Sequence, residues 1–483
     1  MNTIVIVDPV VKVESFRLAG QTCSRVQLVV KLSSRIGWPW MNYAPLILMV
    51  LWSSLAGAFA ASAETPNILL IFSDDQGFHD VGCYGSEIET RHLDRLAAGG
   101  MRFTQFYAAS SICTPSRYGL LTGRYAHRSA DQLTSALMFL AQEDKSRGLR
   151  AGETTYVTRL QEAGYRTALV GKWHLGHGEE MFWPTRHGFD SFFGHTGGCV
   201  DFFTLDYGNR PDWYRGRQLV RPNGYATDVI TNEAIGELAR AKQDGRPFYL
   251  HVAYNAPHFG KGWDAANEET VNVMQPRSED LKRVEHLDDP LRRAFAAKVV
   301  GMDEGVGRLL DALERHDLDE NTLVIFMTDH GGDPDYGGSN LPFRGGKATL
   351  YEGGIRVPCI VRWPQHVAPQ SVCDDVACAV DWYATFGQIV GYGSGQTDGR
   401  SIENLLLGKP AESPRTLVWK TGAHRELGRQ SWQAVRDGDW KWVKAPDREA
   451  ELFDLNRDPR ETVDRSGELP EVARRLAALA EQS

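Results

Sequence analysis

The 483-residue sequence has few cysteines, no extended block of positive charge, and no internal repeat or low-complexity tract. Its seven cysteines are too scattered to indicate a disulfide framework, although Cys373 and Cys378 are near enough in sequence to pair. With a formal net charge of −9 and no basic block, nothing indicates binding to nucleic acid. Any anion must therefore be bound by a local group of positive side chains.

An apolar run at residues 45–63 ends in small residues, as the hydrophobic region and cleavage site of a secretory signal peptide do. Cleavage after Ala60 or Ala63 would fit, whereas interrupting serines and a glycine weaken the alternative of a transmembrane anchor. We therefore predict that residues 1–63 are a leader without a folded domain and that the protein is secreted or periplasmic. The residues before Met41 either extend the signal or precede the true start.

Continuous apolar runs recur along the chain, which is the pattern of strands buried in a parallel sheet. The runs and the polar residues that follow them are Asn67–Ser73 before Asp74 and Asp75, Thr167–Val170 before Lys172 and His174, Phe248–Ala253 before His258, and Thr322–Thr328 before Asp329 and His330. Helical patterns alternate with them at 91–98, 154–163, 226–242 and 290–315. The alternation predicts an α/β fold with helices on both faces of the sheet. Ligands in such sheets bind beyond the carboxyl ends of the strands, so these polar residues should converge there.

The pattern changes after about residue 380 to short alternating runs separated by turns. The runs cover residues 432–436, 440–444 and 451–455, and a helical pattern covers 471–480. We therefore predict a main domain over residues 64–380 and a smaller C-terminal α+β domain over residues 381–483, with an antiparallel sheet and a closing helix.

A short helical pattern surrounds Cys113. Thr114 can cap a helix whose first position is Pro115, and Gly123 would end it. Cys113 would then lie at the helix N-terminus, where unpaired N–H groups favour an anion, and Arg117 could point to the same place from one turn further on. The segment predicts a site for a nucleophile and an oxyanion, although on these features alone Cys113 could equally be a small apolar residue before a turn.

The pattern Cys113-x-Pro115-x-Arg117, followed by Leu-Thr-Gly-Arg at 121–124, resembles the signature of the type I sulfatases, the formylglycine-dependent, arylsulfatase-like branch of the alkaline phosphatase superfamily. The resemblance runs from about Pro66 to the end of the chain. It implies an alkaline phosphatase-like fold with a large mixed sheet, a catalytic domain over residues 64–380, and hydrolysis of a sulfuric ester. It also implies a formylglycine-generating enzyme that oxidises Cys113 to formylglycine, whose hydrate is the nucleophile.

Asp74, Asp75 and Asp329 offer hard oxygen ligands from two strand ends, which suits Ca²⁺ or Mg²⁺ better than zinc. Any one of them alone could be a turn or cap residue. In the family pattern these aspartates hold calcium together with an asparagine after the third. This chain has His330 there, a nitrogen ligand that calcium favours less. The resemblance therefore implies a calcium site of Asp74, Asp75, Asp329, His330 and the modified Cys113, with magnesium as the alternative.

The resemblance also assigns roles in catalysis. The implied catalytic residues are Cys113, Arg117, His174 and His258, and the implied sulfate-binding residues are Lys172 and Lys347. His258 would protonate the leaving alcohol, and His174 would remove a proton from the hydrate. Lys172 and His174 are two residues apart, so both would face one side of an extended backbone. Without the resemblance, Lys347 would be a loop charge and His258 a structural histidine.

The substrate is predicted only as a class. The segments Phe192–Tyr207 and Trp213–Arg215 are rich in aromatic and hydrogen-bonding groups, which suit a sugar ring or could simply pack on their neighbours. We expect a sulfated carbohydrate, and no stable membrane insertion after signal cleavage. Two alternatives stay open. A phosphonate or phosphate ester hydrolase of the same superfamily carries the same signature, and a secreted binder of sulfated glycans would result if Cys113 were not matured.

Overall fold

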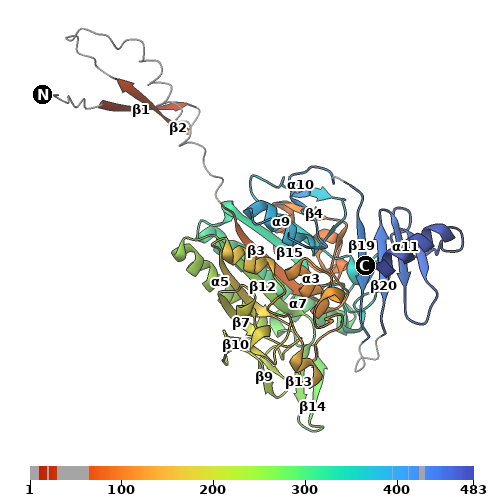
Figure 1. Cartoon of the computed structure of the whole chain (residues 1–483). Coiled ribbons are helices and arrows are strands. Elements are labelled where there is room, and N and C mark those ends of the chain that lie inside the picture. The colour runs from red at the N-terminus through yellow and green to blue at the C-terminus, as the bar shows by residue number, and fades with distance from the viewer. Residues whose placement is uncertain are drawn as a thin grey trace, which may run out of the picture. The chain divides into compact units, whose positions relative to one another are not determined.

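The computed structural model in Figure 1 describes residues 10–18, 21–29, 65–393, 395–411, 413–423 and 430–482, in two units at 1–64 and 65–483. In the first unit, β1 (Val10–Leu18) pairs antiparallel with β2 (Gln21–Val29). An isolated two-stranded hairpin is at best marginally stable. The predicted signal sequence at 45–63 lies outside the described residues, so the leader stays a prediction.

A ten-stranded mixed sheet forms the centre of the second unit, in the order β11-β10-β7-β6-β12-β3-β15-β16-β4-β17. Its middle strands β6 (Arg166–Lys172), β12 (Phe248–Pro257), β3 (Asn67–Asp74) and β15 (Thr322–Thr328) run parallel. Their carboxyl ends therefore lie along one edge, as predicted. The other strands are β7 (Ser191–His195), β10 (Tyr214–Arg215), β11 (Gln218–Leu219), β16 (Cys359–Arg362), β4 (Met101–Phe103) and β17 (Ser371–Cys373).

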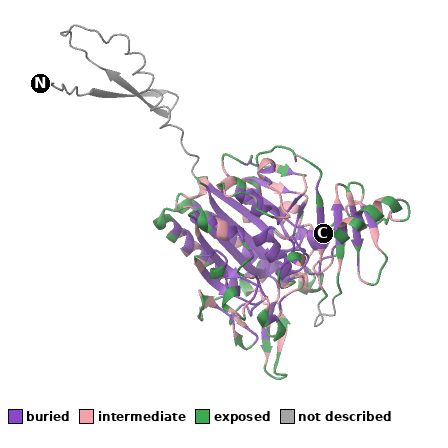
Figure 2. Cartoon of the chain, in the orientation of Figure 1, coloured by how far each residue is buried: buried purple, intermediate pink, exposed green. Residues whose placement is uncertain are grey.

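Helices cover both faces of this sheet because successive side chains of a strand point to opposite faces. Ile68, Leu70 and Phe72 of β3 join one core cluster, with α3, α4 and α9, whereas Leu69 and Ile71 join another, with α2, α5 and α7. Figure 2 shows the sheet buried between these layers. The helices are α2 (Arg91–Ala98), α3 (Cys113–Thr122), α4 (Tyr156–Glu162), α5 (Ala226–Asp244), α7 (Pro290–Arg315) and α9 (Asp381–Val390).

These bounds confirm the predicted helices to within two residues at each end. Apolar residues that recur at helical spacing along α7 are buried in the core, namely Val299, Met302, Val306, Leu309, Leu310 and Leu313. The shorter elements are β5 (Phe106–Tyr107) with β18 (Ala377–Cys378), β8 (Asp206–Tyr207) with β9 (Arg210–Pro211), β13 (Gly260–Asp264) with β14 (Glu269–Val273), and helices α6 (Ser278–Arg283), α8 (Glu352–Ile355) and α10 (Glu403–Leu406).

The C-terminal part contains a four-stranded antiparallel sheet against which one helix packs. Its elements are β19 (Thr416–Lys420), β20 (Gln433–Asp437), β21 (Trp440–Lys444), β22 (Glu451–Asp454) and α11 (Pro470–Gln482). The predicted strands and closing helix are confirmed, and β19 is an addition to them. Helix α9, which follows residue 380, packs on α3 and α4 beside the large sheet.

Two further findings concern the cysteines and the length of the apolar helices. Within the described part of the second unit the cysteines are free thiols, so Cys373 and Cys378 do not pair. Among the residues with described structure, no helix is both long and apolar enough to span a bilayer.

A buried ion cluster joins the C-terminal sheet to α8. The Lys441 ammonium lies 2.8 Å from a carboxylate oxygen of both Glu352 and Glu461, and all three side chains are fully buried. The backbone N–H of Glu352 donates a 2.6 Å hydrogen bond to Glu461. Burial raises the pKa of Glu461 to about 7, whereas the charges of Lys441, Arg356 and Arg436 together outweigh burial and lower the pKa of Glu352 to about 2. Lys441 therefore mainly compensates the charge of Glu352.

Replacing this lysine tests the cluster. Lys441→Met should lower the free energy of unfolding by about 3 to 5 kcal/mol, because it removes the ammonium that the buried carboxyl groups of Glu352 and Glu461 share. Lys444→Met on the same strand is the control, since Lys444 is exposed and its loss should change stability by about 0.5 kcal/mol or less. Denaturant unfolding of both variants gives the comparison, and equal stabilities would show that the cluster does not hold the two parts together.

Candidate active site

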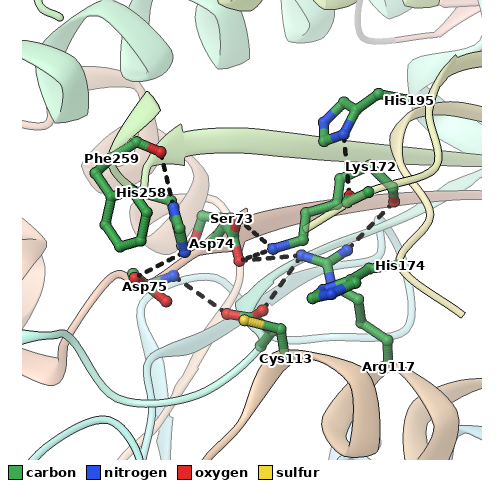
Figure 3. A network of polar contacts seen from close by, with 12 residues as sticks. Ser73, Asp74, Asp75, Cys113, Arg117, Lys172, His174, His195, His258 and Phe259 are labelled. Atoms are coloured by element: carbon green, nitrogen blue, oxygen red, sulfur yellow. Dashed lines mark hydrogen bonds and ion pairs between the residues drawn. The ribbon is translucent and has the colours of Figure 1, made fainter. Parts of the chain in front are cut away.

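Polar side chains from the four parallel strands meet at the carboxyl edge of the sheet, facing the N-terminus of α3 (Figure 3). Asp74 ends β3 and Lys172 ends β6, while His258 and Asp329 directly follow β12 and β15. All four side chains are buried. The structure therefore brings together residues separated by more than 200 positions in the sequence, as the strand pattern predicts.

Helix α3 begins at Cys113 and ends at Gly123, whose φ of 66° is the left-handed conformation that glycine adopts readily. The prediction that Thr114 caps this helix is wrong, because the N-cap residue is Ile112. The Thr114 hydroxyl instead donates to the carbonyl of His174 at 3.1 Å and accepts from the N–H of Leu137 at 3.1 Å. Thr114 therefore ties two loops to the start of the helix, and Cys113 lies in its first turn.

The environment of Cys113 favours a negative charge. Its thiol is buried and lies 3.2 Å from Nε2 of His330. Burial alone would raise the pKa of this thiol, but the charges of Lys172, Lys347 and His330 bring it well below its usual range. One turn further on, the Arg117 guanidinium lies 3.3 Å from the carboxylates of both Asp74 and Asp329. An oxyanion at position 113 would be stabilised by the same charges.

Two lysines reach this site, and each pairs with a different aspartate. The ammonium of Lys172 donates to both oxygens of Asp74 at 2.7 and 2.8 Å, and that of Lys347 donates to both oxygens of Asp75 at 2.6 and 2.8 Å. The loop that carries Lys347 is fixed beside α3, because the N–H of Ala348 donates to Ser111 at 2.8 Å. Although burial acts against it, the charges of the paired aspartate and of Cys113 together raise the pKa of each lysine, so both are cationic.

The aspartates fit a divalent cation. Two sets, Asp75 with Cys113 and His330, and Asp74 with Cys113 and Asp329, each place their ligand atoms within 4.8 Å of one another. Burial raises the pKa of Asp75 to about 6 and that of Asp329 well above its usual range, so a cation would relieve the cost of charging them. Carboxylate oxygens suit a hard ion such as Ca²⁺ or Mg²⁺. His330 Nε2 lies 3.4 Å from Asp75 and 3.6 Å from Asp329, within the same cluster.

The two predicted histidines are held differently. His174 has a φ of 58°, so the assumption of an extended backbone there is wrong, yet its side chain borders the same pocket as Cys113. Its Nε2 lies 2.9 Å from the Leu137 carbonyl, whereas Nδ1 has no hydrogen-bond partner among the described residues. The Nδ1–H of His258 donates to the Phe259 carbonyl at 2.8 Å, and Nε2 lies 3.5 Å from Asp75.

A pocket of about 180 Å³ borders this cluster. Cys113, His174, His258 and Lys347 line its reactive end. The remaining wall combines aliphatic residues with four aromatic residues, Phe139, Tyr207, Phe259 and Tyr336, and includes Lys261 and Asn272 from the β13–β14 hairpin. Sequence reasoning missed most of this wall, because Phe139, Tyr336 and the hairpin do not directly follow a predicted strand.

The two aromatic segments, 192–207 and 213–215, were predicted either to contact a sugar or to pack on their neighbours, and the structure shows both pocket-lining and core residues in them. Phe192, Phe193 and Trp213 are buried in the core, so they pack on their neighbours. Cys199 and Tyr207 line the pocket. Of the predicted segments, therefore, only the later part of 192–207 contributes to the pocket lining.

Comparison with known proteins gives consistent matches over the second unit. The Sulfatase family model matches residues 66–392, and the model for N-sulphoglucosamine sulphohydrolase, C-terminal, matches 345–481. Arylsulfatase A of Bos taurus is 34% identical over 430 residues, which cover 82% of this chain and 77% of the relative. N-acetylgalactosamine-6-sulfatase of Canis lupus familiaris is 33% identical over 429 residues, covering 81% and 77%.

A solved structure shares the fold. The crystal structure of Ps i-CgsB in complex with k-i-k-neocarrahexaose superimposes with a TM-score of 0.77 at 29% identity, covering 87% of this chain and 92% of the other.

The cation can be tested without measuring activity. Adding Ca²⁺ to chelator-treated protein should raise its thermal midpoint, because a ligand that binds the folded state stabilises it by mass action. Asp329→Ala should abolish this shift. Asp333→Ala removes a carboxylate that lines the pocket outside the cluster and should keep it. The measurement is the thermal midpoint of the wild type and of both variants during titration with Ca²⁺ or Mg²⁺. An undiminished shift in Asp329→Ala would mean that the cation binds elsewhere.

Proposed function

The chain belongs to the sulfatase family and is a sulfuric ester hydrolase, and we propose that it removes sulfate from a sulfated carbohydrate through a formylglycine made from Cys113, with a bound divalent cation. The observation that carries the proposal is the position of Cys113 at the start of α3, among Lys172, Lys347 and Arg117. The names of the N-acetylgalactosamine-6-sulfatase relative and of the neocarrahexaose complex support a carbohydrate substrate.

Lys172 and Lys347 are placed to bind the sulfate group. Each is held by an aspartate, and each carries a positive charge beside Cys113. As charge shifts onto the sulfate oxygens during hydrolysis, fixed ammonium groups stabilise it without having to reorganise. When bound to Asp74, Asp75, Asp329 and His330, the cation would supply further positive charge at the same place.

The modified residue at position 113 explains how turnover is completed. A hydrated aldehyde carries two hydroxyl groups, so one oxygen can attack sulfur while the other later loses a proton, which reforms the aldehyde and releases sulfate. His174 can accept that proton at Nδ1, because its Nε2–H is engaged with Leu137. Burial lowers the pKa of His174, which keeps the ring neutral and able to accept.

His258 is placed to protonate the leaving group. Its Nδ1–H is held by Phe259, so Nε2 is the atom that carries the transferable proton. Burial and the charge of Lys347 lower the pKa of His258 well below its usual range. A sulfate ester bound at Lys347 brings a negative charge that offsets this effect and favours the protonated ring.

The aromatic wall of the pocket supports a sugar as the alcohol part of the substrate. Phe139, Tyr207, Phe259 and Tyr336 offer apolar ring faces, and Lys261 and Asn272 offer hydrogen bonds beside them. Phosphate esters carry more negative charge than sulfate esters, so comparing the two on one preparation separates the predicted alternative. We also propose, on the sequence pattern at 41–63, that a signal peptide exports the protein to the periplasm or the exterior.

Conversion of Cys113 to formylglycine would change the mass of the peptide that contains it. In protein made by its native host, the peptide that contains Cys113 should carry an aldehyde in place of the thiol. Mass spectrometry of that peptide, with an aldehyde-reactive probe, measures the extent of conversion, and Cys113→Ala serves as the control that cannot be converted. Fully active protein with only the unmodified thiol would remove the proposed nucleophile.

General acid catalysis predicts a dependence on the leaving group. His258→Ala should slow hydrolysis of N-acetylgalactosamine 6-sulfate by about 10²- to 10⁴-fold, because a sugar alkoxide needs a proton to leave. It should slow 4-nitrophenyl sulfate far less, since nitrophenolate is stable without one. Lys172→Ala is the control and should slow both substrates alike, because Lys172 meets the sulfate itself. An equal loss on both substrates in His258→Ala would instead assign His258 to binding or structure.

A further inference from the structure

Helix α7 carries a buried lysine in its core-facing region. Lys298 is 1% exposed and lies between the buried residues Ala297 and Val299. Its neighbours on the helix, among them Phe295, Val299 and Val300, belong to an apolar core cluster. A buried ammonium is costly unless it is paired and hydrogen-bonded, so the contacts of this side chain need an explanation.

The Lys298 ammonium has two close contacts. Its Nζ donates a hydrogen bond to the backbone carbonyl of His258 at 2.5 Å. It also lies 3.4 Å from the centre of the Phe202 ring, in a cation–π contact. Within the described part of the chain no carboxylate pairs with it, and Asp74, Asp75 and Asp201 act on it only from longer range. Burial accordingly lowers the pKa of Lys298 well below its usual range.

These contacts complete the support of His258. The N–H of His258 donates to the Asp74 carbonyl at 3.2 Å, and its carbonyl accepts from Lys298, so the residue is held on both sides. The ring is oriented by a third bond, from Nδ1–H to the Phe259 carbonyl. If the lysine donor were lost, the buried carbonyl of His258 would lack its partner, and the peptide that joins it to Phe259 could turn. The next peptide carries the Phe259 carbonyl that accepts from the ring, so a turn at the first peptide would also loosen this acceptor.

We propose that Lys298 is a positioning residue for acid catalysis, holding the backbone of His258 so that Nε2 stays directed into the pocket. The proposal rests on the proposed function, in which His258 protonates the leaving group. Lys298 itself does not line the pocket and touches neither sulfate nor sugar there. Its effect should therefore appear only in steps that use His258.

The test compares two aryl sulfates of different leaving-group quality. Lys298→Met keeps a flexible unbranched side chain, one atom shorter than lysine, and removes the donor. It should slow kcat for phenyl sulfate by about 10-fold or more, since misplacing a catalytic group by about 1 Å can cost about 10²-fold. It should slow 4-nitrophenyl sulfate by less than about 2-fold, as phenolate needs the proton more than nitrophenolate does. The double variant with His258→Ala should be no slower than His258→Ala alone, because both changes remove one function.

Two further variants separate positioning from stability. Lys298→Gln keeps an N–H donor and should preserve the wild-type ratio of the rates on the two aryl sulfates. This variant also tests the proposal if Lys298→Met does not fold. Val306→Ala removes buried volume from the same helix and should change both rates by one factor. An equal loss of activity on both aryl sulfates in Lys298→Met or Lys298→Gln would overturn the proposal. So would a double variant with His258→Ala whose loss of activity is the product of the two single losses.

Failure of the proposed function would look different. Wild-type protein with matured position 113 would then cleave neither ester, or His258→Ala would not distinguish them, and the inference about Lys298 would fall with it. A wild type that cleaves both esters, with a selective His258→Ala and an unselective Lys298→Met, would overturn only the inference.

Discussion

The parallel pairing of β6, β12, β3 and β15 is the constraint on which the site depends. Because the strands are in register, Asp74, Lys172, His258 and Asp329 emerge at one edge of the sheet, although they are far apart in sequence. The alternation of side chains along β3 then supplies both hydrophobic cores. A rigid sheet edge holds catalytic groups more accurately than loops alone would.

Buried charge is the cost of this arrangement, and nearly every charge at the site is compensated by another. Lys172 faces Asp74, Lys347 faces Asp75, and Arg117 bridges Asp74 and Asp329. Removing one member of such a set leaves its partner charged in a medium that solvates it poorly. A change to one of these charges should therefore alter the local stability of this edge of the sheet as well as the charge of the site.

The sequence predicted the fold well because strands buried on both faces are uniformly apolar and helices end at glycine or proline. It predicted the polar residues at strand ends for the same reason, and the resemblance at Cys113 added their roles. The cap at Thr114 was wrong, because a hydroxyl that bonds two distant loops looks locally like a cap. The residues of the pocket wall, and Lys298 and His258, come together only in the tertiary structure. Local sequence patterns therefore do not predict these contacts. Lys298 lies on the buried side of α7, but the sequence alone does not show what this side chain contacts.

The ion cluster at Lys441 sets an order of events during synthesis of the chain. Helix α8 accepts a hydrogen bond from Gly331, next to His330, and donates one to Arg344 in the loop of Lys347. Its own anchors, Lys441 and Glu461, lie near the C-terminus. The segment around Cys113 leaves the ribosome long before them. The loop of Lys347 therefore gains this support only when synthesis is almost complete, which leaves the α3 segment without it during translation.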